Sequence, residues 1–268
     1  MTRFLITPQW QGSPSARAML LVDGATAISG DLPRKDTVTL DVPLEAGEAL
    51  GTGVHRLSSL LRVRELVREG IAHSDETAVI IGGDCSVSVF ALSAIDTSDV
   101  AVLWCDAHGD LHDPSTSPSG AFSGMALRAV LGEGEPQLAL SPGIPRERVV
   151  VLGARNIDHG EQDELARLTS IPSADVDDAD SVAAAVEATG AARVWVHIDV
   201  DVLDPAELAG VSDAAPFGVA TAALVAAIRK VRERMPIVGA TIAGFAPRQV
   251  EDAVHDMGAI LRLIGSVA

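Results

Sequence analysis

The stretch "HIDVDVLDP" (residues 197–205) directly follows the apolar run "RVWV" (193–196) and carries three aspartates. The β-branched and aromatic residues predict a buried strand over 193–198. Carboxylates this close together repel one another unless water or a cation compensates their charge. We assign Asp204, the aspartate of the "DP" pair, to a turn. The sequence therefore predicts that the remaining aspartates meet a cation at the end of a strand.

Short apolar runs alternate with Ala- and Leu-rich stretches along the whole chain. This alternation predicts an α/β fold with a mostly parallel central sheet covered by helices on both faces, and we expect one domain over 1–268. The expected strands are 4–7, 77–81, 100–104, 148–154, 193–198 and 236–243. The expected helices lie near 53–70, 86–95, 123–131, 161–168, 180–189, 220–234 and 249–264. A turn-rich segment, 111–124, is long enough to predict a functional loop.

The chain has a formal net charge of −17, from 20 basic and 37 acidic residues among 268. This balance argues against nucleic acid and anionic membrane surfaces as partners, and favours a cationic ligand or metal ions. We find no signal-peptide core and no apolar run near the roughly 18 residues of a membrane span. Two cysteines make no disulfide framework, so we expect a cytoplasmic location.

Polar residues follow three of the expected strands at the point where each one ends. Because ligands of parallel sheets bind beyond the carboxyl ends of the strands, we expect these residues in one crevice. Residues i and i+2 of an extended chain point to the same side, so Asp106 can converge with His108, and Asp199 with Asp201. Four carboxylates and an imidazole suit Mn²⁺ foremost, with Ni²⁺, Co²⁺ or Zn²⁺ as alternatives. The four carboxylates are those of Asp106, Asp110, Asp199 and Asp201, the imidazole is that of His108, and Asp84 and Cys85 follow the strand at 77–81.

Each of these patterns has a simpler structural explanation when taken alone. An isolated "DxD" is more often a turn or a helix cap, and an isolated buried histidine is more often a hydrogen-bonded core residue. "DAHGD" and "DVDVLDP" together, each after an apolar strand, favour a metal site. His112 and Asp113 either solvate the loop or face a substrate.

Four blocks of the chain resemble the ordered signature blocks of the ureohydrolase family, which includes arginase, agmatinase and formimidoylglutamase. These blocks are "GGDCS" (82–86), "WCDAHGDLHDPSTSPSGAFSGM" (104–125), "GARNIDHGE" (153–161) and "HIDVDVLDP" (197–205). The resemblance implies a three-layer αβα arginase-like fold, two Mn²⁺ ions, and a homo-oligomer, either a trimer or a hexamer. It also implies a hydrolase that cleaves a linear C–N bond of a guanidino, amidino or amide-like small molecule, itself cationic or amino-acid-like.

The resemblance also implies roles for individual residues. Asp106 and Asp199 would bridge the two ions. His108 and Asp201 would complete the shell of one ion, and Asp110 and Cys85 that of the other. The remaining positions carried over are Asp110 and Ser123 as catalytic residues, and His112, Ser119, Asp158, Glu161 and Gly244 as substrate-binding residues.

Four positions depart from the family pattern. Cys85 stands where a metal-binding histidine is expected, and its softer thiolate favours Zn²⁺ or Fe²⁺ over Mn²⁺. Ala121 replaces an asparagine that contacts the substrate, and Ser123 replaces a histidine regarded as a proton shuttle. Gly244 replaces the glutamate that pairs with the guanidinium group. We therefore expect arginine to be a poor substrate, and we expect a glutamate at 244 to raise the rate of arginine hydrolysis.

Two functions remain open on the sequence. The first is a metallohydrolase whose substrate differs from arginine. The second is a catalytically lapsed relative that binds metal and serves as a binding or assembly protein. A deacetylase-like activity is an intermediate alternative, which "DAHGD" disfavours. The retained carboxylate and imidazole ligands favour the enzyme, because an idle cluster of acids is electrostatically costly. Cys85 is either a metal ligand or a small, inert, buried thiol.

Overall fold

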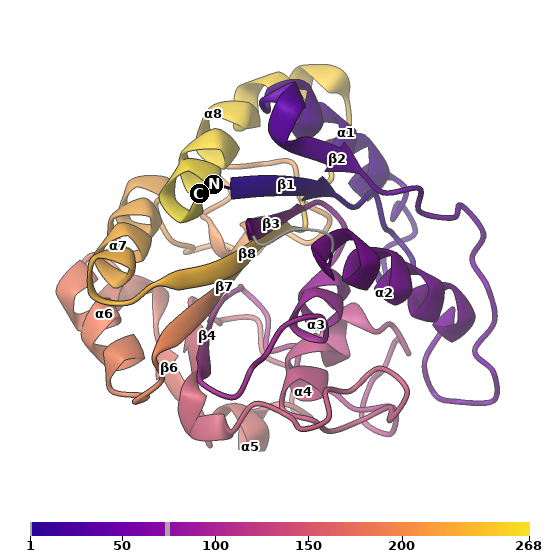
Figure 1. The fold of residues 1–268 in the computed structure, drawn as a ribbon, viewed down its shortest axis with the longest axis horizontal. Coiled ribbons are helices and arrows are strands. Elements are labelled where there is room, and N and C mark those ends of the chain that lie inside the picture. The colour runs from indigo at the N-terminus through magenta and orange to yellow at the C-terminus, as the bar shows by residue number, and fades with distance from the viewer. Residues whose placement is uncertain (1, 73–75) are drawn as a thin grey trace.

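A computed structural model describes residues 2–72 and 76–268, and its centre is a parallel β-sheet (Figure 1). Within these residues eight strands pair in the order β2-β1-β3-β8-β7-β4-β5-β6. All named pairings between neighbouring strands are parallel. The strands are β1 (Thr2–Ile6), β2 (Thr37–Thr39), β3 (Thr77–Ile81), β4 (Val100–Cys105), β5 (Val149–Leu152), β6 (Thr169–Ile171), β7 (Arg193–Asp199) and β8 (Ile237–Ala243).

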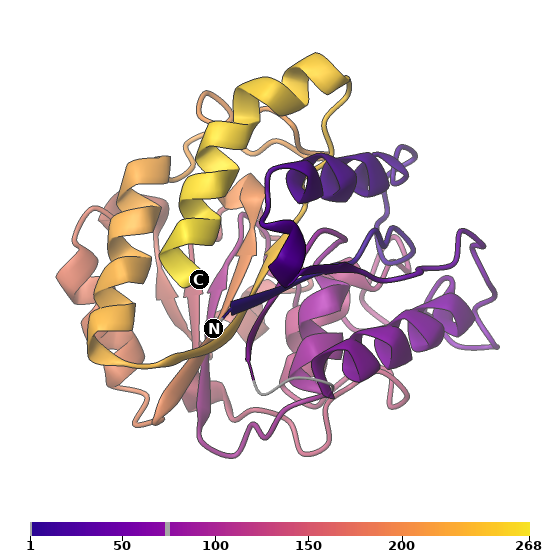
Figure 2. The same ribbon diagram turned by 45° about the horizontal axis from the view of Figure 1, so that its top comes forward.

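Helices cover both faces of the sheet and make the three layers expected from the sequence (Figures 1 and 2). One apolar core lies under α1, α6, α7 and α8, and a second lies under α2, α3 and α4 on the opposite face. The helices are α1 (Leu20–Gly30), α2 (Leu57–Ala72), α3 (Ser86–Leu92), α4 (Ala126–Val130), α5 (Gln162–Leu165), α6 (Ala179–Glu187), α7 (Thr221–Arg234) and α8 (Val250–Val267). None of the helices in the described ranges is both long and apolar enough to cross a membrane.

The central strands are buried along nearly their whole length. Every residue of β4 is buried, as are the last six of the seven residues of β7. Strands covered on both faces lose the alternation of apolar and polar residues and become continuous apolar runs. This is why the sequence located them readily.

Two edge strands and one helix were not predicted from the sequence. β2 and β6 have three residues each and are mostly exposed. Exposed edge strands need no apolar run, because only one side of their backbone pairs with the sheet. Helix α1 (LLVDGATAISG) contains a glycine in its interior and β-branched residues, which weaken the helical signal. The predicted helix over 123–131 is a 3₁₀ turn at Ser123–Met125 followed by α4.

Candidate metal centre and substrate cavity

The site begins at a sharp turn after β3. Gly82 and Gly83 have φ angles of 91° and 78°, a region that favours glycine, and they direct the chain from β3 into α3. The carboxylate of Asp84 accepts a hydrogen bond of 2.8 Å from Nε2 of Gln9. This bond fixes the turn that presents Cys85, the residue immediately before α3.

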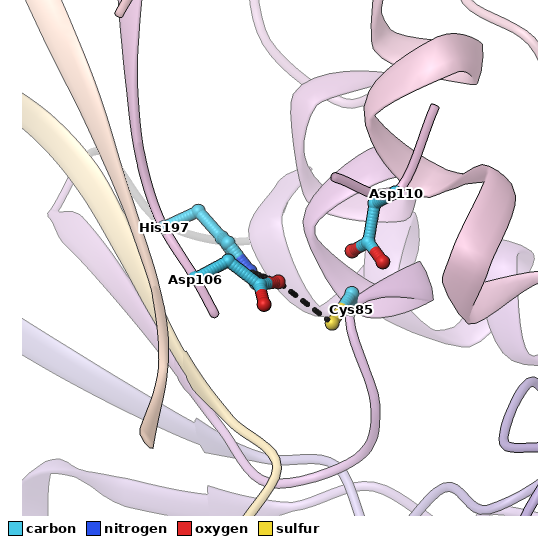
Figure 3. A group of neighbouring side chains, drawn as sticks. All are labelled: Cys85, Asp106, Asp110 and His197. Atoms are coloured by element: carbon cyan, nitrogen blue, oxygen red, sulfur yellow. Dashed lines mark hydrogen bonds and ion pairs between the residues drawn. The ribbon is translucent and has the colours of Figure 1, made fainter. Parts of the chain in front are cut away.

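The first group of candidate ligands consists of one thiol, two carboxylates and one imidazole (Figure 3). One ligand atom from each of Cys85, Asp106, Asp110 and His197 lies within 4.8 Å of the others, and all four residues are buried. Sγ of Cys85 lies 3.6 Å from Oδ2 of Asp106 and 3.1 Å from Oδ2 of Asp199. The thiol at position 85 therefore lies among carboxylates at the carboxyl edge of the sheet.

The second group shares Asp106 with the first. Nδ1 of His108 lies 3.4 Å from Oδ1 of Asp106 and 3.0 Å from Oδ2 of Asp201. The backbone N–H of Asp201 donates to Oδ1 of Asp199 at 3.0 Å. The residue pairs that the sequence placed on the same side of each strand end do meet in the fold. The two groups form a continuous cluster around a shared carboxylate.

Burial sets the protonation of this cluster. Burial, reinforced by neighbouring carboxylates, raises the pKa of Asp110 and Asp199 well above the usual range. Burial alone would also raise the pKa of Asp106, but the imidazoles of His108 and His197 lower it overall. Burial opposes the charged form of His108, yet hydrogen bonds to Asp106 and Asp201 raise its pKa overall. In the absence of a metal, protons compensate part of the negative charge.

A second set of polar residues, His112, Asp158 and Glu161, lies on the same cavity as the carboxylate cluster. Nε2 of His112 lies 3.1 Å from Oδ2 of Asp158, and Nδ1 lies 3.2 Å from Oγ1 of Thr116. Glu161 is buried and accepts from the backbone N–H of Leu111 at 2.8 Å and of Asp158 at 3.1 Å. Glu161 thus braces the loop that carries His112.

This cavity has a volume of about 470 Å³. Of the residues to which the sequence assigned a metal-binding, catalytic or substrate-binding role, only Asp106 does not line it. The others that line it are Cys85, His108, Asp110, His112, Ser119, Ser123, Asp158, Glu161, Asp199, Asp201 and Gly244. The cavity is large enough for an amino-acid-sized molecule, and several carboxylates lie on its wall.

The surroundings of Gly244 bear on the expectation that a glutamate there improves arginine hydrolysis. A Cβ on this residue would lie 2.0 Å from Oδ1 of Asp199, and its φ angle is 82°. A glutamate at 244 would therefore collide with a carboxylate of the candidate metal centre before it could reach a substrate. This close approach argues against the expectation that the substitution improves arginine hydrolysis, because Gly244 leaves room for Asp199.

His197 and Asp213 are among the residues of the site that sequence reasoning missed. His197 stands two positions before Asp199, so strand periodicity places both side chains on the same side, yet we assigned His197 no role. Asp213 lines the cavity from the segment after β7, and its Oδ2 lies 3.4 Å from Nε2 of His108. No periodicity or motif distinguished Asp213. By contrast, Asp204 accepts backbone hydrogen bonds from Ala206 and Gly218, in keeping with the predicted turn.

Comparison with known proteins places this geometry in a family. The sequence model of the arginase family matches residues 20–266. The chain belongs to the arginase family. It is 32% identical over 212 residues to an N(omega)-hydroxy-L-arginine amidinohydrolase of Streptomyces lavendulae, covering 77% of this chain and 74% of that protein. It is 29% identical over 215 residues to an arginase of Staphylococcus aureus, covering 70% of this chain and 71% of the relative.

The fold of this arginase-family protein also matches a solved structure. A crystal structure of Entamoeba histolytica arginase in complex with L-ornithine superposes with a TM-score of 0.87 at 22% identity, covering 99% of this chain and 97% of that one. The protein is thus a ureohydrolase-type hydrolase with the arginase-like α/β fold.

The candidate ligands of this arginase-family protein fit the binuclear metal cluster that the family generally uses. Its two groups of candidate ligands share Asp106, are largely buried, and combine carboxylates with imidazole and thiol donors. Buried acids in such numbers are stable only when protons or cations offset their charge. The donor set is therefore suited to two divalent ions.

Proposed function

We propose that this protein is a binuclear metal-dependent amidinohydrolase that acts on an N-hydroxyguanidino amino acid in preference to arginine. The observation that carries the proposal is the sharing of Asp106 between two groups of candidate ligands at the floor of an amino-acid-sized cavity. The activity named for the Streptomyces lavendulae relative supports the choice of substrate.

In this proposal the ligands are divided between the two ions as the family resemblance implies. Asp106 and Asp199 would contact both ions, His108 and Asp201 would hold one, and Cys85 and Asp110 would hold the other. Divalent ions in such a site act as Lewis acids and lower the pKa of bound water from 15.7 to about 7. Mn²⁺ is the first candidate, and the thiol at position 85 adds Zn²⁺ and Fe²⁺ as alternatives.

The substrate is oriented by polar residues of the cavity. His112, Ser119 and Asp158 line the cavity and are proposed to bind the α-amino and α-carboxylate groups. Glu161 contributes by holding the backbone of Leu111 and Asp158. This arrangement would direct the side chain of the substrate toward the carboxylate cluster, where its guanidino carbon reacts.

The reaction adds water to the guanidino carbon and breaks the bond to the side-chain nitrogen. The leaving nitrogen takes up one proton, so the products are an amine and hydroxyurea. Proton delivery to a leaving amine needs a positioned side chain. Asp110 and the hydroxyl of Ser123, both on the cavity wall, are proposed for this role.

The absence of a carboxylate at Gly244 supports a hydroxylated substrate. A guanidinium is a permanent cation near neutral pH, and a missing carboxylate partner costs it a charge-assisted hydrogen bond of about 1.5–3 kcal/mol. An N–OH substituent withdraws electrons and makes the guanidino group less basic. A less basic group depends less on a carboxylate partner, so the absence of a carboxylate at position 244 lowers the binding of the hydroxylated substrate less than that of arginine.

The test compares Nω-hydroxy-L-arginine with L-arginine at equal concentrations of protein loaded with Mn²⁺. Both substrates release ornithine, so one amino-acid assay measures both rates. We expect kcat/KM to be at least 10-fold higher for the hydroxylated substrate, a difference of about 1.4 kcal/mol. Equal or faster hydrolysis of L-arginine would refute the substrate, and no hydrolysis of either by metal-loaded protein would favour the lapsed relative. The matched controls are Asp199→Asn, expected to be inactive, and the surface variant Asp96→Asn, expected to be fully active.

A further inference from the structure

His197 is a fully buried histidine to which the family resemblance assigns no role. It lies on β7, and its ring stacks on the indole of Trp104 with centroids 3.7 Å apart. Nδ1 lies 2.7 Å from Oγ of Ser88 on α3. Nε2 has no hydrogen-bond partner among the described residues and lies 3.7 Å from Oδ2 of Asp106. Nδ1 is thus held by Ser88, whereas Nε2, which faces the cluster, lacks a hydrogen-bond partner.

Buried ring nitrogens nearly always have a partner, and an unpaired one calls for a physical explanation. Figure 3 shows the ring of His197 directed at the carboxylate of Asp106, with Cys85 beyond it. One ring nitrogen of His197 also lies within 4.8 Å of one ligand atom from each of Cys85, Asp106 and Asp110. A divalent ion held by these side chains would satisfy Nε2.

The contact with Ser88 is the kind that metal-binding histidines make. A ligating imidazole usually donates its other ring N–H to an oxygen, which fixes the tautomer and the ring orientation. If Nδ1–H donates to Oγ of Ser88, the lone pair of Nε2 points toward the cluster. Ser88 follows Cys85 by three residues, so one turn at the start of α3 supplies both the thiol and the group that orients the imidazole.

We propose that His197 is a metal ligand, supplied by β7 in place of the histidine that is missing at position 85. The proposal rests on the metal-dependent function proposed above. One ion would then be held by Cys85, Asp106, Asp110, Asp199 and His197, and the other by a set without sulfur. Thiolate and imidazole donors favour Zn²⁺, Fe²⁺ and Co²⁺, whereas carboxylates suit Mn²⁺. The two sites therefore differ in metal preference.

The competing role for His197 is that of a positioning residue, with Nε2–H donating to Asp106. The separation of 3.7 Å exceeds that of a hydrogen bond. The two roles require opposite tautomers, because a ligand needs a bare Nε2 and a donor needs a protonated one. A measurement that reports on the ring nitrogens separates them.

The decisive experiment uses the wild-type protein with ¹⁵N-labelled histidine and ¹¹³Cd²⁺ at saturation. We expect scalar coupling from cadmium to one ring nitrogen of each of two histidines, His108 and His197. His197→Gln should remove one coupling and leave the other, and the exposed His255→Gln should remove neither. Two bound cadmium ions with coupling to one histidine alone would overturn the role of His197 and leave the proposed function standing. No bound cadmium would overturn both.

Cadmium affinity gives a second readout that preserves packing. His197→Phe keeps a ring against Trp104 but has no nitrogen, and Ser88→Ala removes the orienting hydroxyl. We expect His197→Phe to lower the affinity for one of the two cadmium ions by at least about 100-fold. Ser88→Ala should lower the affinity for the same ion by about 10- to 100-fold. The affinity of the other ion should stay within a few-fold of wild type. Unchanged affinities for both ions in His197→Phe would contradict the proposal.

Discussion

Sγ of Cys85 lies 3.1 Å from Oδ2 of Asp199, although the two residues are 114 positions apart in the chain. The contact joins the start of α3 to the end of β7 and places position 85 inside the carboxylate cluster. The other cysteine, Cys105, is buried in the apolar core between strands and helices. Of the two explanations for Cys85, the metal ligand accords better with these surroundings than the inert thiol.

Metal should protect Cys85 from thiol reagents. Burial and the neighbouring Asp110 and Asp199 raise the pKa of Cys85, so we expect slow modification in the metal-free protein. Bound metal should slow it further by occupying the sulfur. The measurement is mass spectrometry after exposure to a small neutral thiosulfonate, in a Cys105→Ala background that leaves one thiol. Equal labelling rates with and without Mn²⁺ would mean that Cys85 does not bind metal.

Replacing Cys85 should change metal selectivity. Cys85→His exchanges a thiolate for an imidazole, which is less selective for soft ions, so the ratio of Zn²⁺ to Mn²⁺ affinity should fall by about 10-fold or more. Cys85→Ser serves as the size-matched control and should lower the affinities for both Zn²⁺ and Mn²⁺. Calorimetric titration of Zn²⁺ in competition with Mn²⁺ measures the ratio of the two affinities at each site. If Cys85→His leaves both affinities at their wild-type values, position 85 does not reach the ion.

Metal should stabilise the folded state, because it relieves repulsion among buried carboxylates. At a metal concentration 100-fold above Kd the gain is about 2.7 kcal/mol. This corresponds to a rise in Tm of roughly 5 to 10 °C for a chain of this size. Differential scanning calorimetry with Mn²⁺ and then with excess chelator checks it. Asp110→Asn, which removes one of the buried charges, should show a much smaller response, whereas Asp96→Asn should respond like wild type.

The fold was predictable where burial is continuous and not where it is partial. β3, β4 and β7 carry apolar runs that end in aspartates, so both the strands and their polar ends could be located from the sequence. β2 and β6 leave no such trace because they are short and exposed. In the site, spacing revealed the pairing of Asp106 with His108. It could not reveal that Nε2 of His197 is unpaired, or that Gly244 makes room for Asp199, because both facts depend on contacts between separate strands.

Gly244→Ala should impair the metal centre. The added Cβ would lie 2.0 Å from Oδ1 of Asp199, and the φ angle of 82° is strained for any other residue. We expect a loss of stability of about 1–3 kcal/mol and weaker metal binding. Gly265→Ala is the matched control, since a Cβ there meets nothing within 4 Å on α8, and it should be neutral or stabilising by up to about 1 kcal/mol. Metal titrations and denaturant unfolding of both variants decide the point. Wild-type metal affinity in Gly244→Ala would show that Asp199 can move without consequence.

Arg155 braces the loops beside Asp201, and even its replacement by lysine should damage the site. Its guanidinium donates to the carbonyls of six residues in three separate segments, Gly153, Asp201, Val202, Leu203, Ala215 and Pro216. A lysine offers three donors on a compact ammonium and cannot reproduce this planar pattern.

Arg155→Lys should therefore lower the free energy of unfolding by about 2–4 kcal/mol, the equivalent of one or two lost hydrogen bonds to a charged group. The affinity for the ion proposed to bind His108 and Asp201 should fall more than the affinity for the other ion, because Arg155 holds the backbone of Asp201. Arg167→Lys is the matched control, since Arg167 is exposed and pairs with Glu164, and it should change neither quantity measurably. Urea unfolding with chelator present measures the stability loss separately from the metal, and titration with Mn²⁺ measures the two affinities. Equal weakening of both ions would indicate general destabilisation, and would contradict a specific role for Arg155 in placing Asp201.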